Sequence, residues 1–131
     1  MAADDGVITR IDDGQQEQNC HCTGQWNAVY LVHADGSQTW YGHLKRYSMG
    51  GLSVGDSVRK GDRLGIVASS GCSTGPHLHF EVYDGNGALI DPFVGPCNGT
   101  TNHSWWDDQV PYRQPRINAL LTHSAPPSLD C

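Results

Sequence analysis

Short runs of strand-forming residues alternate with turn residues over the first two thirds of the chain. Asp35-Gly36 separates residues 26–33 from residues 38–44, and Asp-Gly between two apolar runs is a strong signal of a β-hairpin. The same pattern predicts further short strands at residues 6–11, 52–58, 64–68, 77–83 and 88–90. We therefore expect an all-β fold, an antiparallel sheet of at least six short strands that ends near Pro92.

The last third of the chain differs in composition, because it is rich in proline. Five of the seven prolines follow residue 93: Pro96, Pro111, Pro115, Pro126 and Pro127. They leave room for one short helix, around residues 116–122. The sequence predicts two parts, a β domain over residues 1–92 and an irregular, Pro-rich C-terminal extension over residues 93–131, tied down by cysteines.

Length and charge narrow the function classes. A chain of 131 residues, of which 37% are hydrophobic, is long enough to fold around one hydrophobic core. The net charge of −6 argues against a nucleic-acid partner, which needs clustered Lys and Arg. No apolar run is long enough to span a bilayer, so membrane insertion is not expected. The first residues do not read as a signal peptide, and nothing in the sequence indicates an oligomeric state.

The five cysteines point to an oxidising compartment. Cys20-His21-Cys22 is one residue short of the Cys-x-x-Cys spacing of zinc fingers, so disulfides are favoured. We predict that Cys72 pairs with Cys20 or Cys22 and that Cys97 pairs with Cys131. The odd count then leaves one thiol over.

Three histidines stand where chemistry is expected. His77 and His79 are two residues apart on a predicted strand, so both rings should share one face while Leu78 and Phe80 point to the core. His43 ends the second strand of the predicted hairpin. If these strands are neighbours, the three imidazoles converge. Two outcomes are then open: all three bind one Zn²⁺, or some bind the metal while others transfer protons.

Three sequence blocks, in this order, carry a family resemblance: Tyr41-Gly42-His43-Leu44; Val54-Gly55-Asp56-Ser57-Val58 with Gly61 and Leu64-Gly65; and Ser70-Gly71-x-Ser73-Thr74-Gly75-Pro76-His77-Leu78-His79-Phe80-Glu81-Val82. They resemble the lysostaphin/LytM-type zinc metallopeptidases, over residues 3–92. The Gly-Pro-His-Leu-His-Phe run is the most specific part of the match.

The resemblance implies an antiparallel β domain with a narrow groove and a zinc ion, and hydrolysis of peptide bonds, most often in bacterial peptidoglycan cross-bridges. By the same resemblance His79 is a zinc ligand, and His43 and His77 are catalytic. The partner implied is a peptidoglycan peptide. The cysteine just before the Ser-Thr-Gly-Pro-His run is similar to that of the secreted, disulfide-bearing staphylolysin-like branch, which implies a secreted or periplasmic bacterial location.

One departure from the family pattern affects activity. Family members supply two further zinc ligands, a His and an Asp, ahead of a run like the one at residues 3–8, and no histidine precedes His21 here. The expectation is a fragment or a truncated relative, whose 131 residues bind zinc weakly and cleave poorly. The alternative is a non-catalytic relative that binds peptidoglycan or activates a hydrolase. The presence of His43, His77 and His79 favours the enzyme.

Overall fold

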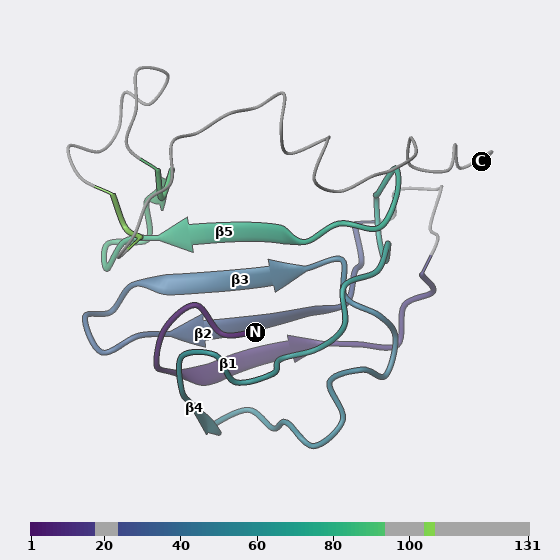
Figure 1. Cartoon of the computed structure of the whole chain (residues 1–131), viewed down its shortest axis with the longest axis horizontal. Helices are drawn as coiled ribbons and strands as arrows, with labels where there is room; N and C mark the ends of the chain where they lie inside the picture. Colours follow the sequence, from purple (N-terminus) through teal and green to yellow (C-terminus); the bar gives the residue numbers. More distant parts are fainter. Residues whose placement is uncertain (18–23, 94–103, 107–131) are drawn as a thin grey trace.

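Six antiparallel strands form one sheet in the computed structural model, which describes residues 1–17, 24–93 and 104–106 (Figure 1). The strands are β1 (Gly6–Asp12), β2 (Ala28–Val32), β3 (Gln38–Gly42), β4 (Ser57–Val58), β5 (His79–Tyr83) and β6 (Leu89–Ile90). Their order in the sheet is β4-β1-β2-β3-β5-β6. The predicted all-β fold is confirmed. The described ranges hold no helix, and therefore none that could cross a membrane.

The hairpin predicted around Asp35-Gly36 is present as β2 and β3. His33 N–H donates to the Ser37 carbonyl at 2.9 Å, and Gly36, at φ 84°, donates to the His33 carbonyl at 3.0 Å. The Asp35 carboxylate accepts from the Ser37 N–H at 2.9 Å and from its hydroxyl at 2.6 Å. The Ser37 hydroxyl, followed by the Ser37 N–H, lowers the pKa of Asp35. The whole turn is thus closed by neighbours in sequence.

Strand β5 adds to the hairpin along β3, far away in sequence. The register pairs Gly42 with His79, Trp40 with Glu81 and Gln38 with Tyr83. Because the strands are antiparallel, the end of β3 lies beside the start of β5. This pairing sets the position of the site described below.

The two faces of the sheet differ. One face carries the hydrophobic core, whose buried members are Ala2, Ile8, Val29, Leu31, Tyr41, Leu44, Met49, Val58 and Leu64. The other carries aromatic rings: Tyr30 contacts Trp40 at 5.0 Å between centroids, and Trp40 contacts Tyr83 at 4.5 Å. Strand alternation places these rings, Glu81 and His79 on the same side.

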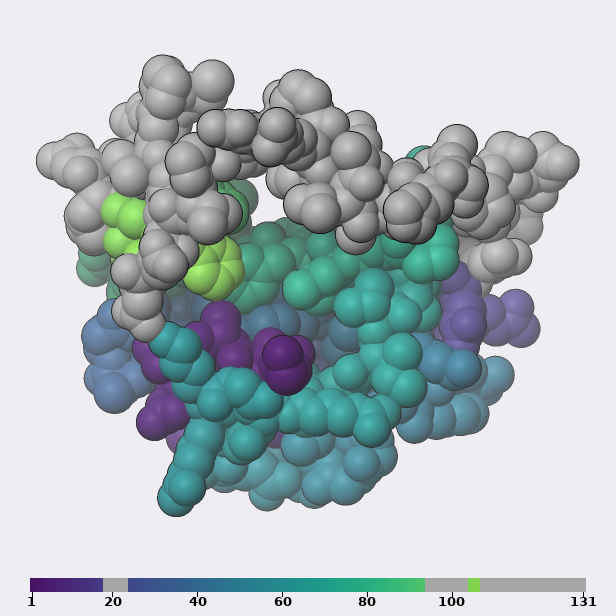
Figure 2. All heavy atoms as spheres, viewed as in Figure 1, coloured from purple at the N-terminus to yellow at the C-terminus, as the bar shows by residue number. Residues whose placement is uncertain are grey.

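The N-terminal residues close one side of the core. Ala2 N–H donates to the Asp62 carbonyl at 2.8 Å, and Gly61 N–H donates to the Ala2 carbonyl at 2.9 Å. Figure 2 shows these purple N-terminal atoms beside the teal atoms of the segment that runs toward β5. Ala2 is therefore buried although it lies near the start of the chain.

Two of the predicted strands, at residues 52–58 and 64–68, are mostly not strand in the structure. Only Ser57–Val58 of residues 52–58 is strand, because turn bonds such as Asp56 N–H to the Ser53 carbonyl fold the earlier part back. Residues 64–68 contribute a single bridge, Leu44 to Val67. They pair with the chain just after β3, where His43 has already left extended geometry at φ 58°.

The strand that carries the two histidines begins later than predicted. β5 starts at His79, because the His77 N–H donates to the Ala68 carbonyl at 3.1 Å instead of pairing with β3. The prediction that Leu78 points into the core is wrong: its side chain is 43% exposed. Phe80, inside the strand, does pack against the core as predicted.

Several predictions fall outside the described residues. These are the helix at residues 116–122 and the pairing of Cys97 with Cys131, and Cys20 and Cys22 also lie there. The boundary between residues 92 and 93 stays a prediction. The described part of the extension contacts the core face, since Trp106 lies 5.6 Å from Phe80 and 5.6 Å from Phe93 between ring centroids.

Candidate functional site

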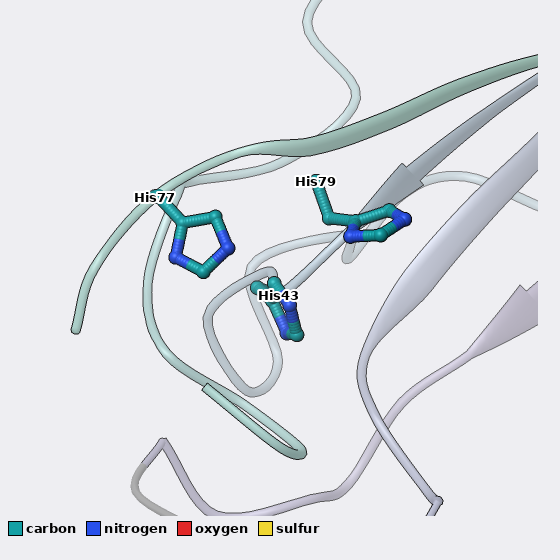
Figure 3. Close-up of side chains that lie close together, drawn as sticks. All are labelled: His43, His77 and His79. Atoms are coloured by element: carbon teal, nitrogen blue, oxygen red, sulfur yellow. The ribbon is translucent and has the colours of Figure 1, made fainter. Parts of the chain in front are cut away.

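Three histidines meet where β3 ends and β5 begins (Figure 3). The ring centroid of His43 lies 4.6 Å from that of His77 and 5.5 Å from that of His79. One potential ligand atom of each residue lies within 4.8 Å of those of the other two. The predicted convergence of His43 with His77 and His79 is confirmed.

Backbone geometry at the end of β3 aims His43 at the cluster. His43 adopts a left-handed conformation with φ 58°, which costs a non-glycine residue about 1–2 kcal/mol. The Ala68 N–H donates to the His43 carbonyl at 2.9 Å, and the Leu44 N–H donates to the Asn27 carbonyl at 3.0 Å. Strain of this kind is typical of functional sites, where the surrounding structure enforces it.

Trp26 packs edge-on against two of the histidines. Its ring lies 5.2 Å from that of His43 and 5.1 Å from that of His79. Gly42 allows this approach, because a Cβ at that position would overlap the Trp26 ring. The glycine before His43 is therefore a steric requirement of the site.

The second ring nitrogen of His43 and of His77 is bound to a backbone carbonyl. His43 Nδ1 lies 2.6 Å from the Ser70 oxygen, and His77 Nδ1 lies 2.8 Å from the Gly75 oxygen. A carbonyl only accepts hydrogen bonds, so both Nδ1 atoms carry the proton. In the neutral rings this leaves Nε2 of each with a free lone pair.

His79 is held differently, by a side chain. Its Nε2 lies 2.5 Å from Glu81 Oε1, and Glu81 Oε2 accepts from the Tyr83 hydroxyl at 2.7 Å. With Nε2 engaged, Nδ1 is the nitrogen of His79 that is left for the cluster. The hydrogen bond to Glu81 raises the pKa of Tyr83 to about 12, so the phenol keeps its proton and donates.

The electrostatic environment keeps His43 neutral. The residue is 5% exposed, and burial lowers its pKa, with repulsion from His77 and His79 acting in the same direction; the bond to the Ser70 carbonyl partly opposes this. A neutral imidazole can accept a proton or bind a metal. In their neutral forms, His43 and His77 offer Nε2 and His79 offers Nδ1, and nitrogen ligands of this kind suit a zinc ion.

Buried Asn27 ties the parts of the site together. Its side-chain amide donates to the carbonyls of Leu44 and Gln15, each at 3.0 Å, and its oxygen accepts from the Gln15 N–H at 2.8 Å. Its own N–H donates to the Ser70 hydroxyl at 3.0 Å. Asn27 thereby links the residue after His43 to the loop whose carbonyl holds the His43 ring.

Sequence reasoning missed these supporting residues. Glu81 and Tyr83 share the alternation of His79, so the period of two could have placed them on its face. The Ser70 carbonyl and Asn27 gave no such signal, since their roles depend on contacts between segments far apart in sequence.

Two cavities lie away from the cluster of His43, His77 and His79. One, of about 440 Å³, is lined by Lys45, Arg46 and Arg63 among others; the other, of about 650 Å³, is lined by His33, Phe80 and Trp105 among others. Neither is lined by His43, His77 or His79, so neither coincides with the candidate site.

The junction of β3 and β5 thus brings together three imidazoles that could hold a metal ion. Residues 1–92 match the family described as Peptidase family M23. The chain belongs to this family, which confirms the resemblance drawn from the sequence blocks.

Individual relatives agree with the assignment. The DD-carboxypeptidase/endopeptidase Mpg of Neisseria meningitidis serogroup B is 44% identical over 69 residues, covering 53% of this chain and 15% of its own length. Lysostaphin of Staphylococcus simulans is 42% identical over 59 residues, covering 44% and 11%. A solved zinc containing peptidase from Vibrio cholerae superposes with a TM-score of 0.51 at 26% identity, covering 67% of this chain and 24% of that one. The chain thus spans less than a quarter of each.

Proposed function

We propose that this chain supplies His43, His77 and His79 to the active site of a zinc-dependent endopeptidase that hydrolyses peptide bonds in bacterial peptidoglycan. The observation that carries the proposal is the convergence of His43, His77 and His79, with potential ligand atoms within 4.8 Å of one another. Membership of Peptidase family M23 and similarity to a zinc containing peptidase support it.

In this proposal His79 is a zinc ligand and the other two histidines are catalytic. Bound zinc would polarise the scissile carbonyl and acidify a water molecule. His43, whose pKa is lowered by burial, accepts the proton of the attacking water through its free Nε2. His77, which is exposed, reaches the substrate, and in its protonated form it would donate from Nε2 to the oxyanion that develops.

The substrate and the location follow from the same relatives. The resemblance to lysostaphin/LytM-type enzymes and the endopeptidase name of the Mpg relative support a peptidoglycan peptide as substrate. The predicted disulfide of Cys72 fits such relatives, because disulfides persist mainly in oxidising compartments. A secreted or periplasmic location is therefore part of the proposal.

Single substitutions separate ligand from catalyst. Bound zinc and peptide release from purified peptidoglycan are measured for His79→Ala, His43→Ala and His77→Ala, with His33→Ala, at the far end of the hairpin, as the control. We expect His79→Ala to lose both zinc and activity. His43→Ala and His77→Ala should keep zinc and lose at least about 100-fold in rate. If all three variants lose zinc equally, all three histidines are ligands and the proposed roles are wrong.

A non-catalytic relative that binds peptidoglycan or activates a hydrolase is the second candidate. The observation in its favour is that the resemblance assigns only one zinc ligand, His79, to these 131 residues. Such a protein would bind peptidoglycan equally well as the wild type and as His79→Ala, and it would release no peptides in either form. Peptidoglycan binding and peptide release, measured for the wild type and for His79→Ala, therefore decide between the two functions.

A further inference from the structure

Three side chains on one face of β5 form a hydrogen-bonded row. His79, Glu81 and Tyr83 alternate along the strand. The two Glu81 oxygens are both used, one 2.5 Å from His79 Nε2 and the other 2.7 Å from the Tyr83 hydroxyl. The row starts at the histidine cluster and runs away from it.

We propose that Glu81, itself held by Tyr83, is a positioning residue that fixes the His79 ring with Nδ1 toward His43 and His77. Metal binding by His79 would then use Nδ1. The metal part rests on the proposed function, whereas the orientation of the ring is a property of the metal-free chain.

The chemistry of the carboxylate sets the tautomer. An ionised Glu81 accepts hydrogen bonds and cannot donate one, so His79 Nε2 must carry the proton. The lone pair of the neutral ring is then confined to Nδ1. Figure 3 shows one His79 nitrogen on the side of the other two rings and one pointing away from them. A carboxylate behind a metal-binding histidine also increases the basicity of the opposite nitrogen.

Packing against aromatic rings limits the rotation of the side chains in this row. The Tyr83 ring lies 4.5 Å from Trp40 between centroids, and Trp40 lies 5.0 Å from Tyr30. The Tyr30 hydroxyl accepts from Trp26 Nε1 at 2.9 Å. Trp26 in turn contacts His79. The contacts therefore return to the histidine from which they started, and each member limits the motion of the next.

Of the three site histidines, only His79 can lose its hydrogen-bond partner through a side-chain substitution. His43 and His77 are oriented by backbone carbonyls, which no substitution of a side chain removes directly. The partner of His79 is a side chain, so replacing Glu81 tests the role of the partner alone. Glu17, the other glutamate of the chain, is exposed and supplies a matched charge control.

The test reads the tautomer of His79 in the metal-free, ¹⁵N-labelled chain by long-range ¹H–¹⁵N correlation at pH 8. We expect the proton on Nε2 in the wild type and in Glu17→Gln. Glu81→Ala should give a mixture of tautomers. Glu81→Gln keeps an acceptor oxygen but also carries an amide that can donate, so it should restore the wild-type state only in part. Tyr83→Phe, which keeps the ring against Trp40, should shift the population partway and serves if Glu81→Ala does not fold.

Zinc affinity, measured by competition with a chromophoric chelator, is the second readout. We expect Glu81→Ala to weaken binding about 10–100-fold and Glu81→Gln to recover part of it. A His79 proton on Nδ1 in the wild type, or an unchanged tautomer in both Glu81→Ala and Tyr83→Phe, overturns the proposal. A wild type that shows the expected tautomer but binds no zinc confirms the positioning role and rejects the zinc site.

Discussion

The two ends of the β2–β3 hairpin are held in opposite ways. At the turn, the bonds that close residues 33–37 join partners within four positions of one another. At the other end, the His43 ring binds a carbonyl 27 residues away, and Asn27 binds a hydroxyl 43 residues away. The turn is a local structure, whereas the site exists only when distant segments meet. Substitutions at the site end should therefore change both stability and zinc binding. Substitutions at the turn should change stability alone.

The largest effect is expected for Asn27→Ala, at the site end. The substitution leaves the Gln15 N–H and the carbonyls of Gln15 and Leu44 without their partner. Since burying unpaired polar groups is costly, the free energy of unfolding should fall by about 2–4 kcal/mol, and zinc binding should weaken with it. Urea denaturation measures the first effect. Asn86→Ala, in an exposed turn, is the control and should change stability by less than about 0.5 kcal/mol.

A smaller loss is expected for Gly42→Ala, beside the site. The new methyl group would overlap the Trp26 ring, so Trp26 must move away from His43 and His79. Overpacking of this kind costs about 1–3 kcal/mol. Thermal denaturation and zinc titration should both show the change. Gly50→Ala adds its methyl group where the nearest atom is 4.0 Å away; equal losses in the two variants would show that the Trp26 contact is unimportant.

The smallest effect is expected for a substitution in the turn between β2 and β3. Asp35→Asn keeps the one oxygen, Oδ1, that accepts both bonds from Ser37 and removes the charge. Because the folded pKa of Asp35 is lowered from 3.8, its charge contributes stability above pH 3.8 that is lost as the pH falls through the folded value. We expect the variant to be less stable than the wild type by under about 1 kcal/mol at pH 6, with the gap closing below pH 3.8. Zinc affinity should be unchanged; a loss there would contradict the independence of the two ends.

The sequence predicted what depends on near neighbours. The hairpin at Asp35-Gly36 and the all-β fold follow from local pattern, and the His-x-His spacing identified two members of the cluster. The convergence with His43 was predicted only on the condition that the strands are neighbours, which the pairing of Gly42 with His79 fulfils.

The predictions from the sequence were wrong where backbone groups form their hydrogen bonds outside the sheet. His77 binds Ala68, and this delays the start of β5 and turns Leu78 out to solvent. The orientation of each histidine ring depends on Ser70, Gly75 and Glu81. Of these partners, only Glu81 lies within the same strand as a site histidine and could have been read from alternation.

The register that joins β3 to β5 also has a kinetic consequence. The hairpin closes a short loop and can form early in folding, while β5 must first close a loop of about 37 residues, which is slower. The hairpin that carries His43 can therefore form before His77 and His79 arrive. In a partly folded chain whose β5 has not yet paired with β3, the three histidines are not together, so the cluster forms only when β5 joins the sheet. Stopped-flow refolding with zinc added at successive delays would show whether metal capture coincides with the last folding phase.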